Sequence, residues 1–247
     1  MNTNTITYTI LEPSTKADPF YLQNLMYDRP IQITDPLTIT IIIPKNCSVF
    51  IIDDLHLSGA TQNTIEFILE ESSQLTYQFF VANHQLCERC EHKELYDCQK
   101  LPAVFEKNIY VNLTAPHAQA FLKCHYLGDQ KSNFKLTTKQ HHQASNTTSK
   151  LIMKSVLDEQ AKLISDSVIT VDKKIKNVTA EQTNKNLMLH PKARVISMPK
   201  LRVNSKDVSC KHGATVSTID QEQLFYLQSR GIEKKEAERI LIEAFLG

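Results

Sequence analysis

The chain has 247 residues, with 28 Lys and Arg against 27 Asp and Glu, and only 5 glycines. An average domain of this length would have roughly 17 glycines, and the five present are far apart in the sequence: Gly59, Gly128, Gly213, Gly231 and Gly247. The sequence therefore has no GxGxxG, GxxxxGK[ST] or GxSxG motif, and we expect no nucleotide site in this chain. The formal net charge of +1 excludes a net field that would attract nucleic acid or a membrane surface.

The apolar runs are all far too short to cross a membrane. The first residues, Met1 to Tyr8, have neither the basic patch nor the apolar run of a secretory signal. Six cysteines in a chain without such a signal are typical of reduced thiols in a reducing compartment. We therefore expect a cytoplasmic protein.

Polar and apolar residues alternate along most of the chain, from about Ile6 to Val216. Clear cases are residues 38–41, 64–69, 108–113 and 150–156, which are rich in Thr, Ile and Val. This pattern predicts strands that bury one face and expose the other. In the second half, strand-like runs begin near Lys150, Lys162, Asn186, Arg194 and Lys206.

Many short strands at regular spacing are typical of a β-sandwich or of a barrel. Tight hairpins, however, normally need Asn-Gly, Asp-Gly or Gly-Gly, and the sequence has none of these pairs. The pattern therefore favours a β-solenoid, in which stacked rungs turn corners with polar residues. We predict an N-terminal segment over 1–35 that leads into a β-body over 36–217.

The periodicity becomes helical in residues 218–247. One helix is predicted from Gln221 to Ser229, with Thr218 or Asp220 as its N-cap and Gly231 as its stop. A second runs from about Lys234 to Phe245, and its predicted apolar face consists of Ala237, Ile240, Leu241, Ala244 and Phe245. Such a pair either closes the end of the core or docks a partner.

Three groups of residues have the chemistry of a metal site. Cys87 and Cys90 have a CxxC spacing, with His92 and Cys98 nearby, which suits a structural metal or describes a polar loop that happens to contain cysteines. Cys210 and His212 would share one face of a strand, either as metal ligands or as a buried thiol and a backbone-bonded imidazole. His141 and His142 would point to opposite faces, and we interpret them as surface or groove residues.

The stretch from about Leu163 to Phe245 resembles the SufB/SufD family of iron–sulfur cluster assembly proteins. The resemblance rests on the HGAT residues from His212 to Thr215, the LFYL residues from Leu224 to Leu227, and the SRGI residues from Ser229 to Ile232. It implies a right-handed parallel β-helix with a C-terminal helical segment. It also implies a non-catalytic scaffold that pairs with a SufB-like paralogue and docks a SufC-like ABC ATPase. The residues do not decide whether the chain forms a homodimer when alone.

Within the family, the chain is most similar to SufD. Gly213 stands where SufB-like chains have a Glu, and no cysteine lies between Cys124 and Cys210. The resemblance implies that His212 lies at the SufB interface, where a transient iron–sulfur cluster forms, with Cys210 on the same face. The residues do not decide whether a flavin binds. We expect unusual backbone geometry at Gly213 and Gly231, the glycines of the two sharpest motifs.

The resemblance also assigns a role to the C-terminal helices. Residues 218–247 would dock the ATPase through the apolar residues Leu224, Phe225, Leu227, Ile240, Leu241 and Phe245. Two alternatives stay open. A β-helix can bind or act on carbohydrate through carboxylates lined up in a groove, for which Asp53 and Asp54 are the obvious acidic pair. A degenerate SufD-like chain would serve only as a dimer brace.

Overall fold

The computed structural model describes residues 4–22, 37–53, 62–82 and 104–247. Cys87, Cys90, His92 and Cys98, the predicted metal ligands, lie outside these residues, as does Asp54. No helix in the described part of the chain is both long enough and apolar enough to cross a membrane.

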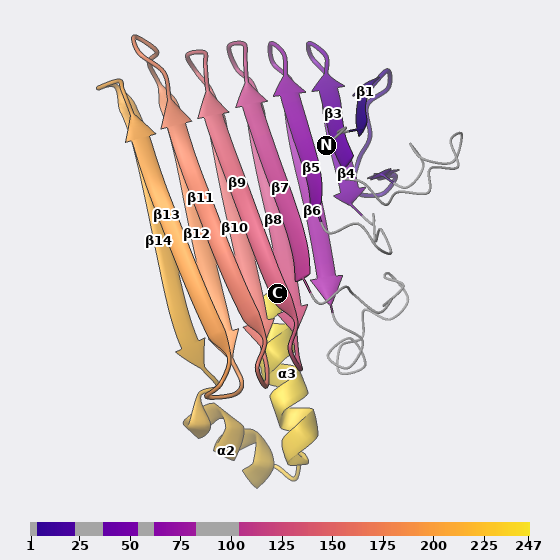
Figure 1. The fold of residues 1–247 in the computed structure, drawn as a ribbon, viewed down its shortest axis with the longest axis vertical. Helices are drawn as coiled ribbons and strands as arrows, with labels where there is room; N and C mark the ends of the chain where they lie inside the picture. Colours follow the sequence, from indigo (N-terminus) through magenta and orange to yellow (C-terminus); the bar gives the residue numbers. More distant parts are fainter. Residues whose placement is uncertain (1–3, 23–36, 54–61, 83–103) are drawn as a thin grey trace.

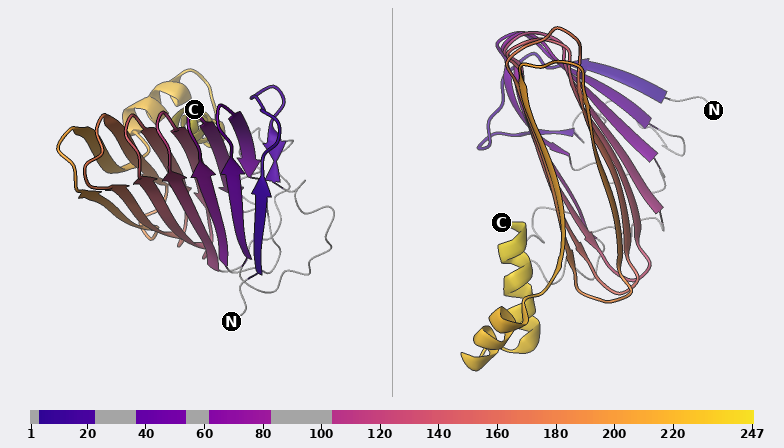
Figure 2. Two further views of the ribbon diagram at one scale, coloured as in Figure 1. Left: turned by 90° about the horizontal axis from the view of Figure 1, so that it is seen from above. Right: turned by 90° about the vertical axis from the view of Figure 1, so that its left-hand side faces the viewer.

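The described strands form two parallel sheets that face each other (Figures 1 and 2). The first sheet contains, in spatial order, β1 (Asn4–Thr9), β3 (Leu37–Ile43), β5 (Gln62–Leu69), β7 (Val104–Leu113), β9 (Asn133–His142), β11 (Lys162–Val171) and β13 (Arg194–Val203). The second sheet contains β2 (Phe20–Tyr21), β4 (Ser48–Asp53), β6 (Gln74–Ala82), β8 (Gln119–Gly128), β10 (Thr148–Leu157), β12 (Val178–Met188) and β14 (Val208–Thr218).

Consecutive strands alternate between the two sheets, so every rung of the structure crosses from one sheet to the other. This arrangement is a parallel β-solenoid, and it confirms the predicted mainly β fold and its parallel β-helix architecture. Most strand positions were also predicted correctly. The exception is β12, which begins at Val178 and not near Asn186.

Alternate residues of each strand fill the space between the sheets. In β11 the inward positions are Leu163, Ser165, Ser167, Ile169 and Val171, all fully buried, and the residues between them are partly exposed. The large central cluster is mostly aliphatic and aromatic, as in the edge-to-face pair of Phe67 and Tyr77. Burial of such side chains is the main force that holds stacked rungs together.

The corners between strands explain how the fold manages with few glycines. Among the residues that the structure describes, eight non-glycine residues have a positive φ, in the left-handed region that glycine normally occupies: Asn46, Ser72, His117, Gln130, Asn146, Glu159, Lys174 and Asn177. Asn and Asp tolerate this region better than most residues. Stacked corners also form hydrogen bonds with each other, as where the Asn177 amide donates to Asn146 at 2.8 Å.

The two helices follow the last strand. α2 (Gln221–Ser229) is capped by Asp220, whose carboxylate accepts from the backbone N–H groups of Glu222 and Gln223. Gly231 has a φ of +87°, which confirms the expected stop. The expectation for Gly213 was wrong: its φ is not positive, and a Cβ there would meet no atom within 4 Å.

α3 (Lys234–Leu246) packs on the outer face of the second sheet (Figure 2). Ile242 and Leu246 enter a small cluster with Phe80, Leu127 and Val156 of the strands. The predicted apolar face was therefore partly wrong. The helix buries Ala237, Ile242 and Leu246, whereas Ile240 and Leu241 are half-buried and Ala244 is exposed.

Candidate functional site

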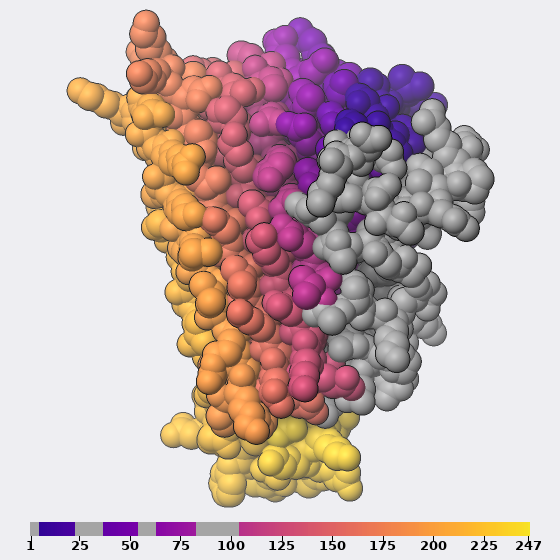
Figure 3. Space-filling model, viewed as in Figure 1, coloured from indigo at the N-terminus to yellow at the C-terminus, as the bar shows by residue number. Residues whose placement is uncertain are grey.

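The solenoid ends in a rung whose edges no other described strand covers. β13 is the last strand of the first sheet and β14 the last strand of the second, and together they form one side of the molecule (Figure 3). The outer edge of each strand presents backbone N–H and C=O groups that pair with no other strand in the described part of the chain. Such edges are ready-made surfaces for pairing with another chain.

The end rung also exposes side chains that the rungs behind it bury. Leu201 and Val203 of β13 are 39% and 37% exposed, whereas Ile169 and Val171, their register partners in β11, are 0% exposed. Val216 of β14 is 54% exposed. These residues occupy core positions without a further rung to cover them, and apolar surface of this kind marks an interaction site.

His212 and Cys210 both belong to β14 and lie two residues apart, on the face of the strand that continues the interior of the solenoid. Their register partners in β12 are Gln182 and Ala180, both 1% exposed. His212 itself is exposed and Cys210 is half-buried. The structure thus places the two predicted site residues together, on one face of the open end rung.

The surroundings of the two side chains differ. Cys210 packs against a cluster that contains Ile169 and Val178, and this burial raises the pKa of its thiol above the ordinary value. A protonated thiol is a weak metal ligand and a weak nucleophile. In the free chain, His212 is therefore the more available donor of the pair.

Polar side chains that sequence reasoning missed tie the end rung to the rung behind it. The Asn184 amide donates to Ser197 at 2.9 Å, and the Asn186 amide donates to the Thr215 carbonyl at 2.9 Å. Both asparagines are at most 1% exposed. Because they fix β13 and β14 from the interior side, they also fix the position of His212.

The helical segment contributes a second surface. Of the predicted docking residues, Phe225 is 72% exposed, Leu224 is buried, and Leu227, Ile240, Leu241 and Phe245 are half-buried. Tyr226, beside Phe225, is 57% exposed, and the Arg230 guanidinium lies 5.2 Å from the centre of its ring. α2 therefore offers a pair of exposed aromatic side chains.

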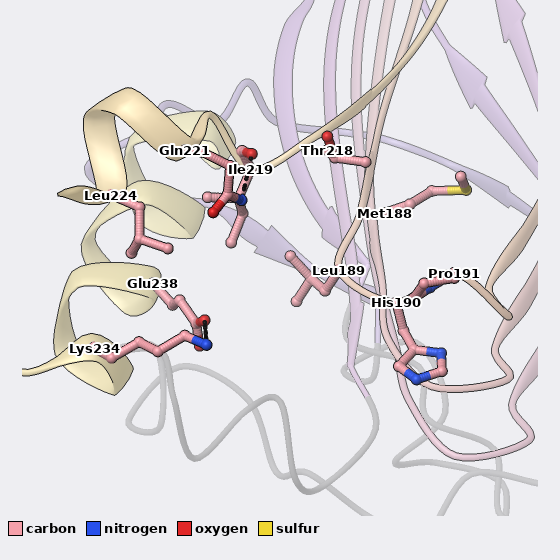
Figure 4. Close-up of a pocket in the computed structure, with 10 residues that line it drawn as sticks. All are labelled: Met188, Leu189, His190, Pro191, Thr218, Ile219, Gln221, Leu224, Lys234 and Glu238. Atoms are coloured by element: carbon pink, nitrogen blue, oxygen red, sulfur yellow. Dashed lines mark hydrogen bonds and ion pairs between the residues drawn. The ribbon is translucent and has the colours of Figure 1, made fainter.

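A pocket lies between α2 and the end of β12 (Figure 4). It has a volume of about 490 Å³ and is lined by Met188 and Leu189 from the end of β12 and by Leu224 from α2. Lys234 and Glu238 of α3 form an ion pair of 3.8 Å at its rim. Because of the pocket, α2 makes only limited contact with the body.

Comparison with known proteins decides the family. A family model described as SUF system FeS cluster assembly, SufBD core domain, matches residues 36–245. The chain belongs to the SufBD core family. The match includes the whole end rung and nearly all of both helices.

Individual relatives of this SufBD chain match over shorter stretches. It is 37% identical over 94 residues to an iron–sulfur cluster assembly SufBD family protein of Synechocystis sp., covering 38% of this chain and 21% of that protein. It is 35% identical over 104 residues to iron–sulfur cluster assembly protein SufD of Escherichia coli, covering 42% and 25%. With SufD of Bacillus subtilis it is 36% identical over 119 residues, covering 48% and 27%. The alignments thus span 21% to 27% of these relatives' own lengths.

The SufBD chain has no complete metal site among its described residues, since no three His, Cys, Asp or Glu side chains there are placed to share an ion. His212 and Cys210 are only two such side chains.

The position of Asp53 argues against the carbohydrate alternative. Its carboxylate is fully buried, pairs with the Lys107 ammonium at 2.6 Å, and accepts a hydrogen bond from the Tyr77 hydroxyl. A carboxylate that acts on sugar must face a groove that is open to substrate. Asp53 instead belongs to the interior of the SufBD solenoid.

Proposed function

We propose that this chain is a non-catalytic, SufD-like scaffold subunit of a SufBCD-type complex that assembles iron–sulfur clusters and passes them to apoproteins. The observation that carries the proposal is the open end rung. It combines two unpaired strand edges, uncovered core residues and the imidazole of His212 on one face. A SufB-like paralogue, whose β-helix would present a matching end rung, is the partner that this surface fits.

In this proposal His212 serves the nascent cluster. A neutral imidazole offers one ring nitrogen to iron, and the hydrogen bond from the Asn186 amide to the Thr215 carbonyl helps to keep β14 in position. Cys210 has one of two roles. It is either a thiolate ligand, once the partner or iron lowers the pKa of its thiol, or a structural thiol that only packs in the interior. The chain itself makes or breaks no bond in the cargo.

The open end rung and the helical segment have separate roles in this proposal. Residues 36–217 form the body that pairs with the SufB-like subunit, and residues 218–247 dock a SufC-like ATPase through α2 and α3. The pocket between α2 and the body leaves room for α2 to shift when the ATPase closes on ATP. Such a shift would reach β14 directly, because Thr218 ends β14 and Asp220 caps α2.

The test is cluster assembly by the chain co-expressed with SufB-like and SufC-like proteins. We expect His212→Ala to lower the yield of assembled cluster at least tenfold while the complex keeps its mass. Lys211→Ala is the matched control, because Lys211 directly precedes His212 in β14 and points to the outer face. This variant should behave as the wild type does. Unchanged assembly in His212→Ala would remove the site, and failure of the wild-type chain to form a complex would remove the scaffold role.

A further inference from the structure

The interior of the last rungs contains a column of polar side chains, whereas the earlier rungs are mostly apolar inside. Thr138 and Gln140 of β9, Ser167 of β11 and Gln182 of β12 all occupy inward positions, and each is at most 2% exposed. At equivalent positions of the earlier rungs the inward residues are mostly Ile, Leu, Phe and Tyr. The change of composition is local to the rungs next to the open end.

The strand register makes this column continuous from the end rung inward. His212 is the register partner of Gln182 across β14 and β12, and Ser167 is the register partner of Thr138 across β11 and β9. Between the sheets, the Asn184 amide lies 3.4 Å from the Ser165 hydroxyl. Inward side chains alternate along a strand, and the facing strands of the two sheets run in opposite directions (Figure 1). The next inward pair is therefore Gln182 opposite Ser167.

The column continues along β9 to a second histidine. Thr138, Gln140 and His142 are successive inward residues of that strand. His142 is fully buried, and its ring nitrogens lie 2.8 Å from the Thr147 hydroxyl and 2.9 Å from the Ser149 hydroxyl. The interpretation of His142 as a surface or groove residue was therefore wrong. The polar path runs from an exposed imidazole to a buried one.

Most hydrogen-bonding atoms in the middle of the path have no protein partner. Within the described part of the chain this holds for the Thr138 hydroxyl and for both amide atoms of Gln140 and of Gln182. Each such buried group costs about 1 to 3 kcal/mol if nothing bonds to it. Folded proteins avoid this cost by binding internal water, which makes about three hydrogen bonds to otherwise unpaired groups.

We propose that this column is a binding site for a file of internal water molecules that joins His212 on the end rung to the buried His142. Gln140 and Gln182 each offer one acceptor and two amide protons, and Thr138 and Ser167 offer hydroxyls, so the walls can hold water in several orientations. The site takes water because its walls carry no net charge that would hold an ion.

The file has a consequence for the open end. When a partner chain covers the end rung, the outer solvent is excluded from His212, but the interior water stays in contact with the rung from behind. The hydration itself does not depend on the proposed assembly role, because it follows from the unpaired groups alone.

The test counts long-lived internal water by oxygen-17 magnetic relaxation dispersion on the purified chain. We expect a contribution from long-lived water in the wild type and a loss of at least one molecule in Gln182→Met, which keeps the length of the side chain and removes the amide. Leu151→Met is the matched control. Leu151 is the register partner of Gln182 in β10, and its replacement leaves the polar groups in place.

Thr138→Val keeps the shape of the side chain and removes the hydroxyl. It allows the same count of long-lived water if Gln182→Met fails to fold. Loss of long-lived water in that variant supports the file. An equal count in the wild type and in the folded variant overturns it. So does a crystal structure in which the Gln140 and Gln182 amides bond only to protein groups.

Discussion

The side chain of Lys154, on the outer face of β10, donates a 2.7 Å hydrogen bond from Nζ to the carbonyl oxygen of Leu246 in the last turn of α3. Lys123 of β8 makes a similar bond of 2.9 Å to the Gly247 carbonyl. Burial and the neighbouring Lys123 and Lys185 lower the pKa of the Lys154 ammonium below its ordinary value. A cation at this end of a helix interacts favourably with the unpaired carbonyls there.

The first prediction concerns this contact. Replacement Lys154→Met should loosen α3 from the sheet, because a hydrogen bond to a charged group contributes about 1.5 to 3 kcal/mol. Amide hydrogen exchange in α3 should become about tenfold faster or more, without a change in the exchange of β10. Lys150→Met is the control, since Lys150 pairs with Glu181 at 3.3 Å on the exposed surface. Equal protection of α3 in both variants would show that Lys154 does not anchor the helix.

The second prediction concerns the exposed aromatic residues of α2. If the helical segment docks an ATPase, Phe225→Ala should weaken binding of the SufC-like protein at least tenfold, because exposed aromatic side chains dominate such interfaces. The melting temperature should not change, since Phe225 is 72% exposed. Titration calorimetry measures the affinity. Glu222→Ala, on an exposed part of the same helix, should bind as the wild type does, and normal affinity in Phe225→Ala would argue for a different docking surface.

The third prediction follows from the corners. Glu159 has a φ of 50° in the turn between β10 and β11, where a side chain costs about 1 to 2 kcal/mol relative to the right-handed region. Glu159→Gly should therefore stabilise the chain by about 1 kcal/mol, after the larger unfolded-state entropy of glycine is subtracted. Urea unfolding measures the change. Gln160→Gly, one residue on and without a positive φ, should destabilise, and a loss of stability in both variants would contradict the argument.

The alternation of residue types predicted most of the fold, and β12 shows where it stops working. The run from Glu181 to Asn186 contains no apolar residue, because the inward residues there are the amides of the polar column. A pattern that separates polar from apolar faces cannot detect a strand whose buried face is polar. The strand can be recognised only from its register with the neighbouring strands. For the same reason, the sequence did not predict the polar column on its buried face.

The residues of the candidate site were predicted from the sequence, but their position in the molecule is known only from the fold. His212 and Cys210 were expected on one face of a strand, and they lie there. Their exposure, however, depends on β14 being the last strand of its sheet, which no local pattern indicates. The face of α3 was misjudged for a similar reason. The helix has two sets of apolar residues at helical spacing: residues 240, 241 and 245, and residues 242 and 246. Only the position of the sheet decides that the second set is the buried one.

The fourth prediction concerns the buried ion pair of Lys107 and Asp53. Lys107→Met should destabilise the chain by about 3 to 5 kcal/mol, because it leaves the Asp53 carboxylate buried without its cation. The double replacement with Asp53→Leu should recover most of this loss, since it removes both charges. Urea unfolding of the two single variants and the double variant measures the coupling. Additive losses would show that the two charges do not depend on each other.

The last prediction is a pH dependence that originates at His142. Burial, with a smaller contribution from His141, lowers the pKa of His142 from 6.5 to about 4, so the folded chain binds this proton less readily than the unfolded chain. The stability that results is fully present above pH 6.5 and is lost as the pH falls toward 4. Between pH 7.5 and 4.5 the loss from this group should be about 2 to 3 kcal/mol.

His142→Gln isolates that contribution, because glutamine keeps hydrogen-bonding groups near Thr147 and Ser149 but does not titrate. The free energy of unfolding in urea, measured at both pH values, should fall by about 2 to 3 kcal/mol more in the wild type than in the variant. Carboxylates and the other histidines titrate in both proteins and cancel in the difference. An identical pH dependence in the two proteins would mean that His142 gains its proton without cost, and that its site is more open to water than its burial indicates.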